Sequence, residues 1–210
     1  MGQLGREGRT INKLSHLRQW AAGHMGNIDH ERRVGAVARA LVQATLPLHA
    51  LSTRDVYLLQ MAAIVHDVGR SIEQKRHAAI GAKMILNDSQ LPLKKRHRRA
   101  LAFLTYHHRG PVPEPGGERF LRSADDTMGL RLLLGFLRAA DALDSRRLPS
   151  PRLGFQLRGR CLRVTCRLGR DSSEARQVFS RRKKFRLLEE MLGCKVQLSV
   201  HAGRRLQMVA

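Results

Sequence analysis

Four side chains in this sequence have the types and spacing of a metal centre: His30, the adjacent pair His66 and Asp67, and Asp141. Each is in register with apolar residues of an expected helix, so each should face the protein interior. A carboxylate in that position must be paired or coordinated, because burying an unpaired charge is costly. Two histidines and two aspartates from three helices form a mixed nitrogen and oxygen ligand set. The sequence therefore predicts a divalent-metal site, without choosing among Mn, Fe, Ni, Co, Zn and Mg.

Further histidines extend this pattern. His77 precedes Ile80 at helical spacing, and His107 and His108 form a pair at the end of another expected helix. Asp67 could then bridge two ions, with these histidines serving the second one. Two ions would clamp a phosphate and hold a hydroxide for in-line attack. The residues leave open whether the site holds one ion or two.

The joint pattern is more specific than any of its members. A single histidine on an apolar helix face is usually a core residue, and an isolated His-Asp dipeptide is common. Here every member falls on a helix face within one helical segment. We therefore expect His66 and Asp67 to form the catalytic centre of a metal-dependent hydrolase acting on phosphate bonds.

Basic residues beside these positions are candidates for holding the phosphate groups of a substrate. Arg33 follows His30 by about one turn, Arg70 follows Asp67 closely, and Arg109 comes directly after His108. The full candidate set is Arg33, Arg70, Lys75, Arg76 and Arg109. Taken singly, each is more often a solvated surface residue. The Pro- and Gly-rich segment 110–119 could act as a lid over the site or as a plain connection.

Hydrophobic periodicity of about 3.6 residues predicts a helical first part. The expected helices cover about 10–24, 27–45, 53–66, 74–86, 93–107 and 128–144. We expect Asn27 or Asp29 to cap the second helix and Thr53 to cap the third. The third is apolar nearly all round, so it should be the central buried helix, with Gly69 placed to terminate it.

The pattern changes after Pro149-Ser150-Pro151. Alternating apolar residues predict strands near 155–157, 162–166 and 196–200, and a last strand near 206–209. A helix is expected over 174–192. The predicted fold is mainly α: a helical bundle with a small C-terminal α+β appendage. We expect a helical metal-binding domain over 1–148 and a small β-rich basic appendage over 149–210.

The formal net charge of +22 indicates anionic partners. Residues 146–210 hold 17 basic and four acidic residues, a net charge of +13. Such a field attracts nucleotides, polyphosphate, nucleic acid or anionic surfaces, although a solvated basic face is an equally good interpretation. No apolar run approaches the roughly 20 residues of a spanning helix, so we expect no membrane association.

The N-terminus and the cysteines indicate the cellular compartment that we expect. The N-terminus has no apolar core typical of a signal peptide, which predicts a cytoplasmic protein. Cys161, Cys166 and Cys194 form no CxxC pair and fit small buried residues of a reducing compartment.

Four segments carry a resemblance to a known family: "HERRVGAVARAL", "LLQMAAIVHDVGRSIEQKRHAAIGAKMIL", "RALAFLTYHHRG" and "LLLGFLRAADALDSRR". They resemble the motifs of the HD-domain phosphohydrolase superfamily. More narrowly, they resemble the C-terminal HD domain of exopolyphosphatase/guanosine-pentaphosphate phosphohydrolase proteins, over about residues 10–200. The resemblance implies a helical bundle with a metal-dependent hydrolytic centre.

Carried over position by position, the metal ligands of that family fall on His30, His66, Asp67 and Asp141. The second-metal histidines of dinuclear relatives fall on His77 and either His107 or His108. Asp144 matches the second aspartate of the "ADALD" segment, which implies a structural role such as holding an arginine.

The chain departs from its relatives in two ways. The actin-like ATPase domain that houses the exopolyphosphatase active site is absent from this sequence, so we expect no activity by that domain's mechanism. Many C-terminal domains of the family have lost the HD ligands, whereas this chain keeps them, which implies chemistry of its own. No Gly-Tyr-Pro follows the loop, which disfavours a cyclic-di-GMP phosphodiesterase of the HD-GYP kind.

The function that fits best is a metal-dependent phosphohydrolase. It would cleave a phosphate ester or phosphoanhydride of a nucleotide, a signalling nucleotide or polyphosphate with a metal-activated hydroxide. A non-catalytic module is the alternative, one that binds polyanions, including nucleic acid, through the basic tail around 181–186, or regulates a separate protein. A homodimer is compatible with either function. Aromatic residues make up only 4% of the chain, so recognition by base stacking is disfavoured.

Overall fold

The computed structural model describes residues 4–122 and 125–202. Most of these residues are helical, and a small three-stranded sheet follows the helices, as the sequence predicted. The strand expected near 206–209 lies outside the described residues. No helix in the described part of the chain is both long and apolar enough to cross a membrane.

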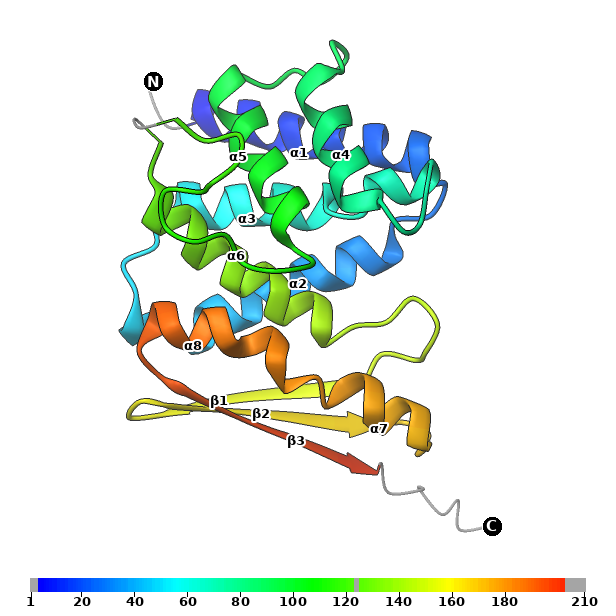
Figure 1. The fold of residues 1–210 in the computed structure, drawn as a ribbon, viewed down its shortest axis with the longest axis vertical. Coiled ribbons are helices and arrows are strands. Elements are labelled where there is room, and N and C mark those ends of the chain that lie inside the picture. Colours follow the sequence, from blue (N-terminus) through cyan, green and yellow to red (C-terminus); the bar gives the residue numbers. More distant parts are fainter. Residues whose placement is uncertain (1–3, 123–124, 203–210) are drawn as a thin grey trace.

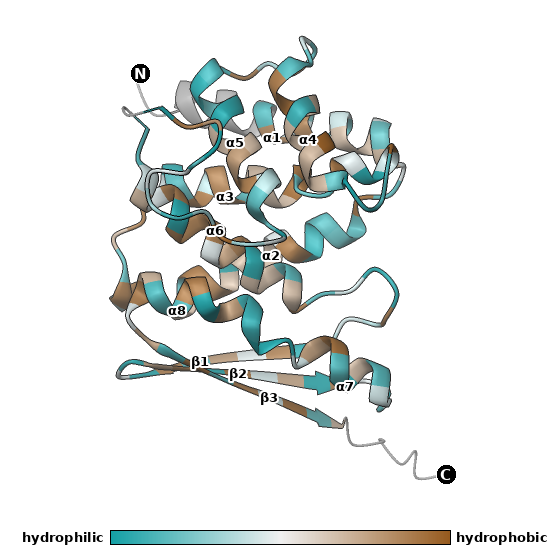
Figure 2. Cartoon of the chain, viewed as in Figure 1, coloured by the Kyte–Doolittle hydropathy of each residue, from teal (hydrophilic) through white to brown (hydrophobic). Residues whose placement is uncertain are grey.

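Six helices build the first part of the chain. They are α1 (Leu4–Met25), α2 (Asp29–Ala44), α3 (Thr53–Val65), α4 (His77–Asn87), α5 (Lys95–His107) and α6 (Thr127–Ala142). Helix α3 packs against α1, α2, α5 and α6, which confirms that it is the central one. Hydropathy colouring shows apolar residues on the faces that these helices turn inwards (Figure 2).

The helix caps differ from the sequence expectation. Ser52, rather than Thr53, caps α3 and exchanges hydrogen bonds with Asp55 in a capping box. Helix α2 has Ile28 at its cap position, with no side-chain cap bond there. Asn27 still contributes, because its side-chain oxygen accepts a hydrogen bond from the backbone N–H of Asp29 at 2.7 Å. The sequence located both helix starts to within one or two residues.

The sheet contains β1 (Arg152–Arg158), β2 (Cys161–Leu168) and β3 (Lys195–Ala202), in the order β1-β2-β3. Strands β1 and β2 are antiparallel, whereas β2 and β3 are parallel. Parallel neighbours need a crossover connection, and here it runs through α7 (Ser173–Phe179) and α8 (Arg186–Leu192). In Figure 1 both crossover helices lie on the same side of the sheet as the helical part.

The single helix expected over 174–192 was wrong. Helix α7 ends at Phe179, Arg181 has a non-helical backbone, and a short 3-10 turn (Arg182–Phe185) leads into α8. Phe179 and Phe185 are both buried. In one continuous helix, side chains six residues apart point about 120° away from each other, so both rings would not enter the core through the same face. Breaking the helix lets both rings enter the core.

The hydrophobic core runs without interruption from the helical part to the sheet. One cluster of buried side chains contains Leu59 of α3, Phe136 of α6, Leu188 of α8 and Val164 of β2. Helix α8 lies on α6, and Gly135 permits the closest approach, since an added Cβ would lie 3.1 Å from the Cα of Leu188. The division at residue 148 stays a prediction.

Candidate metal centre

The central pair of the site lies where α3 ends. His66 is the C-terminal cap of α3, and Asp67 precedes a 3-10 turn (Val68–Ser71). This change of direction lets two adjacent side chains face one centre. Gly69 lies inside the turn and not at the helix end, so the expectation that it terminates α3 was wrong. Its role is close packing, because an added Cβ would lie 2.2 Å from the carbonyl oxygen of His77.

The structure brings His30, His66, Asp67 and Asp141 together. Asp141 Oδ1 lies 3.4 Å from His30 Nε2 and 3.6 Å from His66 Nε2. Asp67 Oδ2 lies 4.0 Å and 3.9 Å from the same two nitrogens. Ligand atoms that each lie about 2.1 Å from one ion are separated by roughly 3–4 Å. Each of the two carboxylates, one just after α3 and one on α6, therefore lies at about this spacing from both histidine nitrogens.

A second group of side chains lies around the other carboxylate oxygen of Asp67. Asp67 Oδ1 lies 3.0 Å from His77 Nε2 and 3.4 Å from His108 Nε2, and the two nitrogens are 3.3 Å apart. Of the pair that the sequence left open, His108 is therefore the one in the site. His107 points away, with its ring against Phe103 and Tyr106. Asp67 belongs to both groups, which is the arrangement of a bridging carboxylate.

The histidines of both groups are oriented in the same way. The Nδ1 atoms of His66, His77 and His108 lie 2.6–2.9 Å from the backbone carbonyl oxygens of Ala63, Gln74 and Thr105, respectively. A carbonyl oxygen can only accept a hydrogen bond, so each Nδ1 is the protonated donor. The Nε2 atoms are then left with lone pairs that face the centre. Second-shell carbonyls and carboxylates commonly fix metal-binding histidines in this way.

His30 is held by a carboxylate instead. Its Nδ1 lies 2.7 Å from Asp144 Oδ2, and the Nε of Arg33 donates to Asp144 Oδ1 at 3.0 Å. Ser150 also donates to this carboxylate. Asp144 therefore orients His30 and binds an arginine, in keeping with the structural role implied by the family resemblance.

Charge and burial act in opposite directions on the site's pKa values. Burial favours the neutral form of His66, but Asp67 and Asp141 outweigh it and raise its pKa to about 9. Burial dominates at His108 and lowers its pKa to about 4, despite the hydrogen bond to Asp67. Burial opposes ionisation of Asp67 as well, but the surrounding histidines hold its pKa far below the usual range. The aspartates are thus anionic, and cationic partners stabilise them.

Unpartnered atoms in this centre fit a bound cation. His66 Nε2 is buried without a hydrogen-bond partner among the described residues, and so is Glu31 Oε2. A buried polar atom that lacks a partner is costly, so native proteins rarely leave one unsatisfied. Nitrogen and carboxylate oxygen atoms aimed at one centre are donors that a divalent transition metal accepts. The residues present therefore fit a metal ion.

Glu31 also approaches the first group. Donor atoms of His30, Glu31, His66 and Asp67 all lie within 4.8 Å of one another. Glu31 Oε1, however, is paired with the guanidinium of Arg146, whose Nε also donates to Asp67 Oδ2 at 3.1 Å. Asp141 lies 3.4 Å and 3.6 Å from the two histidine nitrogens, so Asp141 and Glu31 are both candidate ligands by position.

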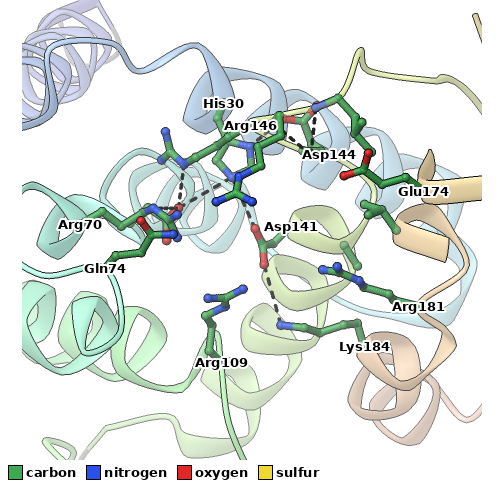
Figure 3. Close-up of a pocket in the computed structure, with 16 residues that line it drawn as sticks. His30, Arg70, Gln74, Arg109, Asp141, Asp144, Arg146, Glu174, Arg181 and Lys184 are labelled. Carbon is green, nitrogen blue, oxygen red and sulfur yellow. Dashed lines mark hydrogen bonds and ion pairs between the residues drawn. The ribbon is translucent and has the colours of Figure 1, made fainter. Parts of the chain in front are cut away.

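A cavity of about 330 Å³ opens beside this centre. His30, Asp67 and Asp141 form part of its lining, and basic side chains from several elements surround Asp141 (Figure 3). The basic lining residues are Arg70, Arg109, Arg146, Arg147, Arg181 and Lys184. Lys184 lies closest, with Nζ 3.8 Å from Asp141 Oδ2, and burial lowers its pKa.

Two of the five predicted phosphate-binding residues, Arg70 and Arg109, line this cavity. Arg33, Lys75 and Arg76 do not. Arg33 is turned to Asp144, and Arg76 is an exposed side chain 3.9 Å from Glu73. Proximity in sequence does not decide whether a side chain reaches the cavity, because Asp144 holds Arg33, and Lys75 and Arg76 lie in the turn before α4.

The sequence did not predict that Arg146, Arg181 and Lys184 line the cavity. Arg146 directly follows the "ADALDS" segment, and this position was the available signal for it. Arg181 and Lys184 were assigned to a uniform basic cluster, but the structure divides that cluster. Arg182 is paired with Glu189 at 2.5 Å, whereas Lys184 turns inwards and donates to the carbonyl of His108 at 3.3 Å.

The loop between α5 and α6 is attached to the helices by buried arginines. Arg138 donates to the backbone carbonyls of His107 and Gly110, and Arg131 donates to that of Pro113. Arg131 also lies 3.6 Å from Glu118. These bonds hold the first half of the loop against α6, which places Arg109 at the cavity.

Comparison with known protein families gives a match. The family model described as Ppx/GppA phosphatase, domain III, matches residues 10–185. This range includes all of the site residues described above and extends through α7 to the turn before α8. A search of curated proteins finds no match.

Proposed function

Because the chain belongs to the Ppx/GppA phosphatase domain III family, we propose that it is a metal-dependent phosphohydrolase with an HD-type centre of its own. The proposed ligands are His30, His66, Asp67 and Asp141 for one ion. His77 and His108, with Asp67 as the bridge, would hold a second. The observation that carries the proposal is the convergence of these side chains around Asp67, beside a basic cavity that His30, Asp67 and Asp141 help to line.

The proposed division of labour follows from the geometry. A divalent cation supplies Lewis acidity and, by lowering the pKa of water, a nucleophile near neutral pH. Asp144 orients His30 through Nδ1, and Arg146 holds the Asp67 carboxylate between the two groups. The cationic lining residues then bind the phosphoryl oxygens, and guanidinium groups do so in bidentate fashion.

The lining of the cavity favours an anionic substrate that carries phosphate groups. Six basic side chains line it, whereas no Phe, Tyr or Trp of the described chain does so. Recognition would therefore act on phosphate groups and contribute little selectivity for a nucleobase. The candidate substrates are nucleotides, signalling nucleotides and polyphosphate, and the bond cleaved is an ester or an anhydride.

Adjacent histidines provide a matched test. We expect His108→Gln to lower the bound metal by one ion per chain if the site is dinuclear, because it removes one of three donors in the second group. His107→Gln changes the same residue type one position away, outside the site, and should leave the metal content unchanged. Metal content is measured by elemental analysis of the purified chain after loading with Mn, Fe, Co, Ni, Zn or Mg.

Activity is tested on a panel of phosphate monoesters, nucleotides and polyphosphates, with and without chelator. Asp67→Ala should abolish hydrolysis and metal binding while the circular dichroism of the fold is retained. Equal metal content in wild type and Asp67→Ala would contradict the proposed centre. Full activity in chelator would contradict a metal-dependent reaction.

The alternative is a non-catalytic module that binds polyanions or regulates another protein. The basic lining contributed by Arg181 and Lys184 favours it, since these side chains can bind phosphate without any reaction. In that case Asp67→Ala would retain polyanion affinity, and Arg181→Gln/Lys184→Gln would lose it, with no turnover by either protein.

A further inference from the structure

The outer face of the sheet presents an ordered array of cationic side chains. Successive residues of a strand point to opposite faces, and residues paired across strands share a face. Leu162, Val164 and Cys166 of β2 are buried against the helical part, so their neighbours at 161, 163, 165 and 167 define the outer face. In Figure 1 no helix covers this side of the sheet.

The strand register fixes the twelve positions of this outer face. They form four cross-strand rows: Arg152, Arg167 and His201; Gly154, Thr165 and Ser199; Gln156, Arg163 and Gln197; and Arg158, Cys161 and Lys195. Five of the twelve are Arg or Lys, and none is Asp or Glu. All five basic residues are exposed.

Four of these basic side chains have no acidic partner among the residues that the structure describes, and Lys195 acts on Glu189 only as a nearby charge that lowers the pKa of that carboxyl. Arg163 donates to Gln197 at 3.3 Å, and no ion pair joins any of the five to a carboxylate. Arg152 and Arg167 are directly opposed across β1 and β2. Like charges in that position destabilise a sheet, so this row lowers stability unless an anion lies over it.

We propose that this outer face binds the phosphate backbone of a nucleic-acid duplex, independently of base sequence. The face extends about 20 Å along the strands and about 10 Å across them. A duplex carries one negative charge per roughly 1.7 Å of its axis, so a length of this order holds about a dozen phosphates, and those on the facing side can lie against the five cations. The uncharged Gln, Ser and Thr positions between them are suited to hydrogen bonds with phosphate and sugar oxygens.

Other anions fit this face less well. Proteins that bind single strands use aromatic stacking platforms, and none of the twelve positions is aromatic. Membrane-surface elements combine basic residues with large apolar ones that enter the lipid, and none of the twelve positions holds such a residue. A polyphosphate chain is a single line of charge, whereas these cations lie on all three strands.

The test uses the full chain and fluorescence anisotropy with labelled duplex DNA and duplex RNA of about two helical turns. We expect the logarithm of the binding constant to fall with the logarithm of the salt concentration. Arg152→Gln/Arg163→Gln/Arg167→Gln should make that slope shallower by about 2.7, at about 0.9 per phosphate contact removed. Scrambling the base sequence should change affinity by less than about twofold, because the contacts are to the backbone.

A matched control separates this face from the general positive field. Arg54→Gln/Lys95→Gln/Arg96→Gln removes the same charge from exposed positions on α3 and α5. This control should leave the salt slope within about 0.5 of the wild-type value. Equal losses in both triple variants would overturn the proposal, since binding would then follow net charge alone.

Two further arms complete the test. If long-chain polyphosphate binds through Arg152, Arg163 and Arg167 and neither duplex does, the duplex proposal is wrong. Asp67→Ala should leave duplex affinity unchanged, because none of the twelve outer-face positions lines the cavity beside Asp67. Failure of the metal-centre proposal and failure of this one are therefore distinguishable.

The melting temperature of the Arg152→Gln/Arg163→Gln/Arg167→Gln variant should not fall, because Arg152→Gln relieves the repulsion between Arg152 and Arg167.

Discussion

Protons and metal ions compete for the same atoms in this site. The Nδ1 atoms of His66, His77 and His108 are committed to backbone carbonyls, so only Nε2 can take up a further proton or an ion. His66 Nε2 is buried beside two carboxylates, and no hydrogen-bond partner for it lies within residues 4–122 and 125–202. A proton on this Nε2 compensates the same carboxylate charges that a metal ion would compensate. The binding of one must therefore displace the other.

This competition predicts opposite pH dependences with and without metal. In chelator, the folded-state pKa of His66 is about 9, above the ordinary value of 6.5, so protonation stabilises the fold. That contribution is fully present below about pH 6.5 and is lost as the pH rises through 9. The lowered pKa of His108 acts in the opposite direction only near pH 6.5, where the unfolded imidazole is still partly protonated, and its effect vanishes as the pH rises further.

We therefore expect the melting temperature in chelator to fall by several degrees between pH 6.5 and 9, as measured by circular dichroism. With a saturating transition metal the trend should reverse over the lower part of this range, because metal binding requires unprotonated Nε2 atoms. A melting temperature that is independent of pH in chelator would show that His66 carries no elevated pKa.

At the scale of elements, the site depends on how closely α4 approaches the turn that follows α3. Gly69 makes this approach possible, because its missing Cβ leaves room for the backbone of His77 and Gly81. His77 is the first residue of α4, so the position of the helix start sets the distance from His77 Nε2 to Asp67. Packing between two short elements thus decides whether the second group of donors can form.

Gly69→Ala should separate these elements. The added Cβ would lie 2.2 Å from the His77 carbonyl oxygen and 2.5 Å from the Gly81 nitrogen, and backbone atoms cannot simply rotate away. We expect a loss of about 1–3 kcal/mol in the free energy of unfolding, as is typical of overpacking. Metal content should fall by one ion per chain in a dinuclear site.

Gly23→Ala is the control for this substitution. Gly23 lies in α1 with nothing within 4 Å of an added Cβ, so alanine should be neutral or stabilise the helix by up to about 1 kcal/mol. Equal denaturation midpoints and metal contents for Gly69→Ala and wild type would contradict the packing role of Gly69.

At the scale of the whole molecule, the C-terminal part is built into both the core and the site. Helix α8 packs on α6, which carries Asp141, and Lys184 reaches from the preceding turn to that carboxylate. Figure 1 shows the crossover helices between the sheet and the helical part. The sheet and its helices therefore help to form the cavity that would receive a substrate.

Gly135→Val tests whether the two parts unfold together. A Cβ at this position would lie 3.1 Å from backbone atoms of Leu188, so a branched side chain must push α8 away from α6. We expect a loss of about 1–3 kcal/mol in one cooperative transition. Fluorescence of Trp20, which lies in α1 far from the sheet, should report the same denaturation midpoint as circular dichroism. A Trp20 midpoint that stays at the wild-type value would instead support separate domains divided near residue 148.

The sequence by itself determined which residue types could serve a metal centre and which helices carry them. Helical periodicity placed His30, His66, Asp67 and Asp141 on interior faces, and it located α1–α6 to within a few residues, apart from the first turns of α1. It also gave the alternation of the strands, because a period of two follows from strand geometry alone. These are local properties of the chain, and local spacing is sufficient to predict them.

Only the tertiary structure decided which neighbours meet. It placed His108 beside Asp67 and turned His107 towards Phe103, because successive side chains of a helix point about 100° apart. It placed Arg146, Arg181 and Lys184 at the cavity, whereas Arg33, Lys75 and Arg76 do not line it. It broke the helix expected over 174–192 so that two phenylalanines could enter one core. Each of these outcomes depends on packing between distant segments, and the spacing of residues along the chain does not encode it.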